Sequence, residues 1–357
     1  MQSRPVDFHL QTVEVHLAAS RYTASTMTED DAVRPFRTQT RVSVPARTSI
    51  CVLDMNEFRP GAAGGGNVGF AFGARTELRV EVSASDAVVH SDGSTWTDQR
   101  ASLIRHVIER WSDAVRICRQ YRVTVDHTNP AHTGLAASAA LQLATWASLN
   151  HIFGHPYSDP ELRRQLARTY REASEQGTQP AFTTGLSSFL GLYGGFAVVG
   201  SNLAPTAHVT LPAWSAAMVV PSGLASVSFG AVELKALTSR GPMLDEQHRV
   251  AKLSTLFDQL VPAVNAHDLP QIGKAVMALQ EVGSKVAEID IYGDAVRLPL
   301  RDLQHEHPCA FMSAVGPGIA VLSHISHDHL QDRLIAAGYD VLWAGVVDDK
   351  GILFKPH

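Results

Sequence analysis

Residues 121–153 are predicted to form a strand, a loop and a long buried helix. Tyr121–Val125 alternates between apolar and polar side chains, which is typical of a strand. A loop that contains Pro130 follows, and Gly134–Phe153 is then rich in Ala and Leu, with no proline to interrupt a helix. Because this helical segment has so little polar surface, we expect it to pack tightly against a sheet.

Helical and strand-like segments are mixed along the rest of the chain. Regular alternation of strands and helices is missing, as is a Gly-x-Gly-x-x-Gly after an early strand, so a dinucleotide-binding fold is not favoured. We expect an α+β protein with an N-terminal extension at residues 1–40, one lobe at 41–190 and a second lobe at 191–357. The helices are predicted at residues 100–119, 134–153, 159–174, 244–264, 269–286 and 327–337. The strands are predicted within 42–53 and at 68–72, 78–82, 121–125, 194–199, 207–211, 217–220, 310–314, 319–322, 341–347 and 352–354.

Charge and cysteine usage exclude several classes of protein. The 357 residues carry 30 Lys and Arg against 35 Asp and Glu, so there is no excess positive charge to bind a nucleic-acid backbone. Uninterrupted apolar stretches are shorter than the roughly 20 residues that cross a bilayer, and charges interrupt the N-terminal segment where a signal peptide needs an apolar run. Three widely spaced cysteines indicate neither a disulfide framework nor a zinc site. We expect a cytoplasmic protein that binds no membrane and no nucleic acid.

The start of the helix at Gly134 predicts a phosphate-binding site. The first amides of a helix lack partners and carry partial positive charge, so they attract phosphate oxygens. The small side chains at 134, 136 and 137 let an anion approach, and Ser138 offers a hydroxyl; the alternative is a turn that serves packing alone. His132 could donate to pyrophosphate when protonated. The predicted phosphate-binding residues here are His132, Thr133, Gly134, Leu135, Ala136, Ala137 and Ser138.

Pro130–Ala140 resembles the P-x-x-x-G-L-G-S-S-A-A motif of the GHMP kinase superfamily. Gly134, Leu135 and Ser138 to Ala140 match the motif, whereas alanines at 136 and 137 replace its Gly-Ser pair. The segment 312–317, about 180 residues later, resembles the third motif of the superfamily, a Gly-rich turn between two strands. The resemblance implies a two-lobed GHMP-kinase-like fold.

Within that superfamily the chain is most similar to the β-ribofuranosylaminobenzene 5′-phosphate synthases and the related C-nucleoside synthases of formycin and pyrazofurin biosynthesis. Pro45–Arg47 and Leu53–Asn56 resemble the family's P-S-R and L-I-D-L-N-G, and Val68–Phe72 resembles part of its G-G-V-G-I-A-L. This resemblance implies transfer of ribose 5-phosphate from phosphoribosyl pyrophosphate to a ring carbon of an aromatic acid, such as an aminopyrazole dicarboxylate. Carbon dioxide and pyrophosphate are lost in that reaction.

Three residues of the matched N-terminal segment are the predicted catalytic residues. Arg47 carries a planar fork that suits a carboxylate or phosphate. Asp54 and Asn56 follow the same strand beside the Gly-rich loop, where they could hold ribose hydroxyls, Mg²⁺ or an amino group of the acceptor. Mg²⁺ is the expected cofactor because it bridges phosphate oxygens with few protein ligands, and we assign no residue as its ligand.

The loop at 177–189 distinguishes between a kinase and a synthase. It contains no Asp or Glu that could take a proton from a substrate hydroxyl, although its hydroxyls and amides suit an anion. If the ring carbon that bears the carboxylate attacks the ribose, carbon dioxide leaves where a proton otherwise would, and no base is needed. The predicted anion-binding residues of this loop are Thr183, Thr184, Gly185, Ser187 and Ser188.

Two other functions remain open at this stage. One is an ATP-dependent small-molecule kinase of the same superfamily, and the other is a sensor that binds a phosphate ligand without catalysis. The expected partners are small molecules, namely phosphoribosyl pyrophosphate and an aromatic carboxylic acid, and a second copy of the chain in a homodimer.

Overall fold

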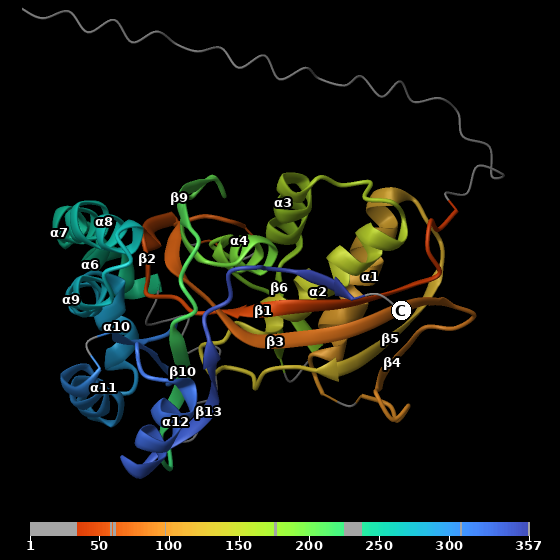
Figure 1. Cartoon of the computed structure of the whole chain (residues 1–357). Coiled ribbons are helices and arrows are strands. Elements are labelled where there is room, and N and C mark those ends of the chain that lie inside the picture. Colours follow the sequence, from red (N-terminus) through yellow and green to blue (C-terminus); the bar gives the residue numbers. More distant parts are fainter. Residues whose placement is uncertain are drawn as a thin grey trace, which may run out of the picture. The chain divides into compact units, whose positions relative to one another are not determined.

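The computed structural model describes residues 34–57, 59, 62–96, 98–174, 177–224, 238–307 and 309–355. Most of the predicted N-terminal extension lies outside these residues. The part of the chain from residue 34 onward is one compact unit built on two sheets (Figure 1).

The first sheet is organised around one long strand, β3 (Asn67–Ser83). Along most of its length β3 lies between β1 (Gln39–Arg47) and β5 (Gln120–His127), and the sheet continues to β14 (Leu353–Lys355) on one side and β4 (Ala87–His90) on the other. Near its start β3 also pairs with β2 (Cys51–Val52) and β8 (Phe196–Val199), and β8 pairs with β9 (Pro205–Val209). Because β8 and β14 follow residue 190, this sheet draws on both predicted lobes, and the division at residue 190 stays a prediction.

The strands predicted at 68–72 and 78–82 are therefore one continuous strand. Between the two predicted segments β3 has a bulge, because Pro45 pairs with Arg75 and Ala46 with Phe72, which leaves two residues of β3 without partners on β1. A bulge of this kind bends one strand while its partner continues. It places Arg47 at the end of β1, beyond the bulge.

Four helices belong to the first sheet: α1 (Ala101–Val115), α2 (Ala137–Ile152), α3 (Asp159–Thr169) and α4 (Leu186–Tyr193). The helix α2 packs on β1 and β3 and also touches the other three helices. Nearly all of its residues are buried, among them Trp146, as its Ala- and Leu-rich sequence predicts. The helix begins at Ala137, three residues later than predicted.

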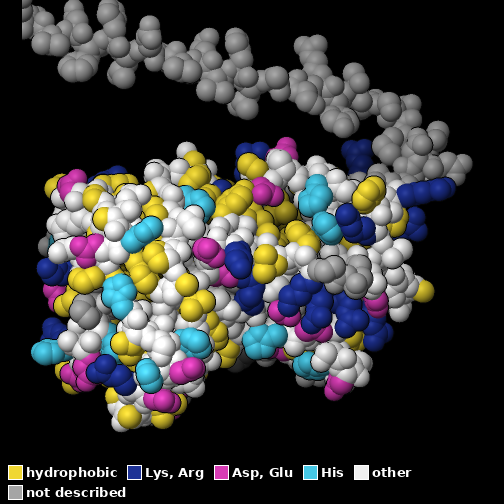
Figure 2. Space-filling view, in the orientation of Figure 1, with side chains coloured by type: hydrophobic (Ala, Val, Ile, Leu, Met, Phe, Trp, Pro, Cys, Tyr) yellow, Lys and Arg dark blue, Asp and Glu magenta, His cyan; other side chains and the backbone are white. Residues whose placement is uncertain are grey.

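The opposite face of the first sheet is polar. Figure 2 shows Lys and Arg side chains gathered over β3 and β5 with acidic side chains between them. Arg41 lies 3.1 Å from Asp126 and 3.5 Å from Glu77, and Arg122 lies 3.7 Å from Glu81. The arginines of these pairs are exposed to solvent, which screens the attraction, so the buried face holds the sheet in place.

The second sheet is antiparallel and has the order β11–β12–β10–β13. Its strands are β11 (Ala310–Met312), β12 (Ile319–Ser323), β10 (Ser215–Pro221) and β13 (Tyr339–Val346). Phe311 of this sheet packs 6.0 Å from Phe70 of the first sheet, and Phe70 in turn lies 5.2 Å from Phe196. The two sheets therefore share one hydrophobic core.

The C-terminal helices are shorter than predicted. The predicted helix at 244–264 is a succession of α6 (Gly241–Gln247), α7 (Arg249–Ser254), a π-helical segment (Thr255–Leu260) and α8 (Val261–Asn265). The predicted helix at 269–286 is divided into α9 (Leu269–Gln280) and α10 (Ser284–Asp290), because Gly283 adopts a positive φ of 65° between them.

The helix α11 (Asp294–Glu306) was not predicted, and it contains Pro299. The helix α12 (His327–Ala336) matches its prediction. Among the described residues no helix is long and apolar enough to cross a membrane.

The predicted helix at 159–174 ends at Thr169 and continues as a hairpin of β6 (Arg171–Ser174) and β7 (Gly177–Pro180). The Gln142 side chain explains the change, because its amide donates to the carbonyl of Arg171 (2.8 Å) and accepts from the amide of Arg171 (3.3 Å). These bonds hold the backbone extended and attach β6 to α2.

Gly69→Ala is expected to lower the free energy of unfolding by about 2 kcal/mol or more. A Cβ at this position of β3 would overlap the carbonyl oxygen of Thr48, which is backbone and cannot rotate away. Gly241→Ala is the control, because its Cβ would meet only ordinary contacts at 3.4 Å and beyond. Urea unfolding measures both variants, and equal stability of the two would contradict the close approach at Gly69.

Candidate functional site

The two motifs that lie about 180 residues apart in the sequence touch each other. The hydroxyl of Ser313 donates to the carbonyl of Gly134 (2.7 Å) and accepts from the amide of Ser49 (3.1 Å). The amide of Ala314 donates to the carbonyl of Ser49 (3.0 Å). One fully buried serine therefore joins the turn at 312–316 to the loop at 132–134 and to the segment between β1 and β2.

Glycines make this close contact possible. Gly134 has a φ of +85°, and a Cβ there would lie 2.7 Å from the carbonyl oxygen of Ser313. A Cβ at Gly316 would lie 2.7 Å from the carbonyl oxygen of His132, and one at Gly318 would overlap that of Thr133. Gly134 is thus required for packing against the turn, in addition to the anion approach predicted from the sequence.

Three non-glycine residues where the motifs meet adopt left-handed backbone conformations. They are His132 (φ 56°), Ala136 (φ 53°) and Ala314 (φ 52°). Each such residue costs on the order of 1 kcal/mol or more, and the surrounding structure must hold it in place. Ala136 is the residue before α2, and its methyl group cannot accept a hydrogen bond from the first amides of the helix. The start of α2 is therefore built without a side-chain cap of its own.

Arg47 has a buried nitrogen atom that lacks a partner. Its Nε donates to the hydroxyl of Ser187 in the first turn of α4 (2.9 Å). Its Nη1 is buried and has no acceptor among the described residues. Burial lowers the pKa of the Arg47 guanidinium. A buried charged donor without an acceptor is costly, so this group suits an anion.

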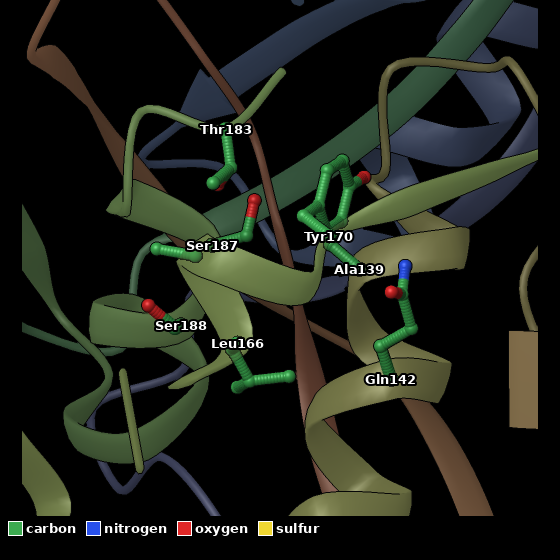
Figure 3. A pocket seen from close by; sticks show the side chains of 8 residues that line it. Ala139, Gln142, Leu166, Tyr170, Thr183, Ser187 and Ser188 are labelled. Carbon is green, nitrogen blue, oxygen red and sulfur yellow. The ribbon is translucent and has the colours of Figure 1, made fainter. Parts of the chain in front are cut away.

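A small pocket lies between α2, α3 and α4, and Ser187, which accepts from Arg47, is part of its lining. Figure 3 shows the Ser187 hydroxyl pointing toward the space between Thr183 and Tyr170. Ser188 is turned away, because its hydroxyl donates to the carbonyl of Gly185 (3.0 Å). The pocket is lined by Ala139, Gln142, Leu166, Ala167, Tyr170, Thr183, Ser187 and Ser188.

Two of the predicted anion-binding residues in this loop have structural partners instead of lining the pocket. Thr184 accepts a hydrogen bond from the buried side chain of Asn67 (3.2 Å). Gly185 precedes α4 with a φ of 76°. Thr183, Ser187 and Ser188 therefore lie on the pocket, and Thr184 and Gly185 support it.

Asp54 and Asn56 form their own cluster at the end of β2. One carboxylate oxygen of Asp54 accepts from both the amide and the side chain of Asn56 (2.9 Å each), and the other lies 3.1 Å from Arg249. Arg47, by contrast, is directed to α4. The three predicted catalytic residues thus have different partners in this structure.

A carboxylate that was not predicted from the sequence lies near the predicted site. Glu172 of β6 accepts a hydrogen bond from the hydroxyl of Tyr170, which lines the pocket. Burial lowers the pKa of His132, and the negative charge of Glu172 opposes that effect. Glu172 also opposes the lowering of the Arg47 pKa. The charge of Glu172 therefore acts on both His132 and Arg47, although Glu172 precedes the loop at 177–189.

Comparisons with known proteins agree with the fold. Residues 102–185 match the family described as the GHMP kinases N terminal domain. A homoserine kinase from Cytophaga hutchinsonii has a similar structure, with a TM-score of 0.63, 18% identity, and 90% of this chain and 99% of that chain covered. A mevalonate diphosphate decarboxylase from Staphylococcus aureus gives a TM-score of 0.61 at 15% identity, with 89% and 98% covered. This chain has a GHMP-kinase-like fold.

The GHMP-kinase-like chain also has a curated relative. This chain is 23% identical over 327 residues to the beta-ribofuranosylphenol 5'-phosphate synthase of Archaeoglobus fulgidus. The aligned region covers 84% of this chain and 94% of that protein. The predicted GHMP-kinase-like fold, the α+β fold class and the similarity to this kind of synthase are confirmed. The roles of the predicted site residues stay predictions.

Titration of His132 tests whether the loop of this GHMP-kinase-like fold binds an anion. Because its pKa is lowered, this side chain is neutral at pH 7, and it makes the fold less stable as the pH falls below about 6.5. Inorganic pyrophosphate at the start of α2 is expected to raise the pKa of His132, since a nearby anion favours the charged imidazolium. An NMR titration of the ring protons measures this, with His267 as the control. A His132 pKa that pyrophosphate leaves unchanged would argue for a turn that serves packing alone.

Proposed function

We propose that this protein joins the ribose 5-phosphate group of phosphoribosyl pyrophosphate to a ring carbon of an aromatic or heteroaromatic carboxylic acid, with release of pyrophosphate and carbon dioxide. The similarity over 84% of the chain to a ribofuranosylphenol 5'-phosphate synthase carries this proposal. The proposed acceptor is an aminopyrazole dicarboxylate or a similar aromatic acid. Arg47 and the uncapped start of α2 supply donors for the anionic groups of such substrates.

In this reaction the donor's phosphates have to be held while charge develops on the leaving pyrophosphate. We assign one phosphate group of the donor to the amides at the start of α2, which no side chain caps. Donors that are already oriented stabilise developing negative charge without reorganisation. Arg47 suits an anion that stays charged throughout the reaction, such as a phosphate. A guanidinium on the departing carboxylate would instead oppose the loss of carbon dioxide, so we assign Arg47 to a donor phosphate or to a second carboxylate of the acceptor.

The bond changes balance without a base. The bond between ribose C1 and the pyrophosphate oxygen breaks, and its electron pair leaves with pyrophosphate. The ring carbon that bears the carboxylate attacks C1, and the bond to the carboxylate then breaks, which returns its electron pair to the ring and releases carbon dioxide. The protein's main task is to position the two substrates. The absence of an acid from residues 177–189 is compatible with this chemistry.

Magnesium is the proposed cofactor. Mg²⁺ commonly binds through substrate phosphates and one or two carboxylates and keeps several waters, so the lack of any group of three or more His, Cys, Asp or Glu suited to a metal among the described residues does not conflict with it. Asp54 is the candidate protein ligand, on the chemistry of its carboxylate. When bound, the ion would neutralise charge on the pyrophosphate. The homodimer also stays a prediction.

A small-molecule kinase is the second candidate function. The match to the GHMP kinases N terminal domain and the similarity of the fold to a homoserine kinase favour it. The lack of an acid at 177–189 counts against it.

An assay with phosphoribosyl pyrophosphate, Mg²⁺ and a panel of aromatic acids is expected to release pyrophosphate and carbon dioxide in equal amounts. An analogue with hydrogen in place of the reacting carboxylate should give no product, because no base is assigned to remove the ring proton. Product from that analogue would contradict decarboxylation at the attacked carbon, and Glu172 would become the candidate base. Steady production of ADP from ATP with a metabolite alcohol would reject the synthase in favour of the kinase.

Arg47→Met is expected to lower kcat/KM by about 10- to 100-fold, the range given by the loss of one or two hydrogen bonds to a charged group. Arg110→Met is the matched control, since Arg110 lies on the surface of α1 and pairs with Asp113 at 3.0 Å. Circular dichroism checks that both variants fold. Activity of the Arg47 variant equal to that of the control would remove Arg47 from the substrate site.

A further inference from the structure

Lys285 and Glu288 form a buried ion pair in α10. Their side chains are 0% and 2% exposed. Burial raises the pKa of the Glu288 carboxyl, and the neighbouring Lys285 ammonium opposes that effect. Removing two charges from water costs several kcal/mol per ion, and apolar side chains of similar volume often do the same packing at no loss of stability. The pair therefore calls for an explanation other than stability.

The hydrogen bonds of Lys285 point to that explanation. Besides pairing with Glu288, its ammonium donates to the carbonyls of Met312 (3.3 Å) and Ala314 (3.1 Å). The three N–H donors of a lysine are thus matched by three acceptors, two of which belong to one turn. Ser313, between these two carbonyls, bonds to Gly134 and Ser49 instead. Lys285 and Ser313 thus hold the same turn through different groups.

The turn in question sets the position of the predicted anion-binding loop. Gly316 and Gly318 approach the backbone of residues 132–134 so closely that a single added carbon would collide with it. Ala314 and His132 both need external support for their left-handed conformations. A displacement of the turn would therefore also displace the residues before α2.

We propose that Lys285 is a positioning residue for the anion-binding loop, which it sets by fixing the turn at 312–316. It does not touch the substrate, because it is fully buried under the turn. Glu288 pairs with the ammonium and directs it, and the negative charge of Glu288 also acts on Arg47. The inference rests on the proposed function only in that the loop at 132–138 binds a phosphate group.

A second buried pair provides a matched comparison. Lys252 pairs with Asp245, and both side chains are almost fully buried. Lys252 donates to the carbonyl of Val52 (3.1 Å), and Asp245 accepts from the amide of Met55 (2.8 Å). This pair lies in α6 and α7 and holds the segment that bears Asp54. Asp245 also accepts from the amide of Ser284 at the start of α10 (2.6 Å), which an Asn at 245 can do as well, and neither residue bonds to the turn.

The test measures binding of inorganic pyrophosphate by calorimetry. The double variant Lys285→Met with Glu288→Met removes both charges, so no buried charge is left unpaired. We expect about tenfold weaker binding, faster amide hydrogen exchange at residues 132–136, and a thermal midpoint close to that of the unchanged protein. The control, Lys252→Met with Asp245→Asn, should keep the affinity within about twofold.

Ser313→Ala keeps the test decisive if the double variant does not fold. It breaks the link between the turn and Gly134 without touching a buried charge, and it should also weaken pyrophosphate binding about tenfold. The proposal is overturned if either loop-directed variant binds pyrophosphate normally, if the control loses as much affinity, or if the unchanged protein does not bind pyrophosphate. Loss of binding in the two variants, together with no synthase turnover by the unchanged protein, would support the role of Lys285 and reject the proposed reaction.

Discussion

The hydrogen bonds of the Ser313 hydroxyl connect parts of the chain that are far apart in sequence. This one group accepts from Ser49 and donates to Gly134, so it joins the end of the first strand, the loop before α2 and the turn of the second sheet. None of these segments forms a complete site alone. The loop has left-handed residues that need support, and the turn bonds to the loop, to Ser49, to Lys285 and to Tyr292. The geometry of the predicted site is therefore a property of the contact between the two sheets.

The burial of α2 explains why this contact can be rigid. The helix has almost no exposed surface, and Gln142 additionally attaches it to β6. A helix that is buried on nearly all sides cannot shift to accommodate an anion, so an anion bound at the predicted site would have to fit the amides as they stand. Preorganised donors of this kind are effective because they need no rearrangement when charge develops.

Much of the fold could be predicted from the sequence where a pattern is local. The apolar residues of α1 recur at helical spacing, and α2 lacks any breaker, so both were predicted with small errors at their ends. The predicted helix at 159–174 failed beyond Thr169 because a distant side chain, Gln142, determines the backbone there. The helix α11 was missed because it contains Pro299, which normally ends a helix. Local propensity carries no information about such long-range contacts.

The candidate site, too, was predicted only where a local sequence pattern exists. The motif residues at 132–138 and 312–317 were found because each is a short pattern of small residues. The buried charges were not, since Lys252 and Lys285 look like surface lysines on helices until their carbonyl partners are known. Glu172 was not predicted because it precedes the loop at 177–189 in the sequence and comes near the pocket only through the hairpin of β6 and β7.

The pairing of β14 with β1 has a consequence for how the protein is made. Arg41 lies opposite Lys355, so one of the first strands of the described chain is completed by one of its last residues. A ribosome that has released only the N-terminal half leaves β1 with an open edge, and β3 also lacks β8 until residue 199 has emerged. Pairings between such distant residues form slowly because a long loop must close first. During synthesis of this chain there is thus an interval in which the incomplete sheet exposes unpaired strand edges, and such edges favour aggregation.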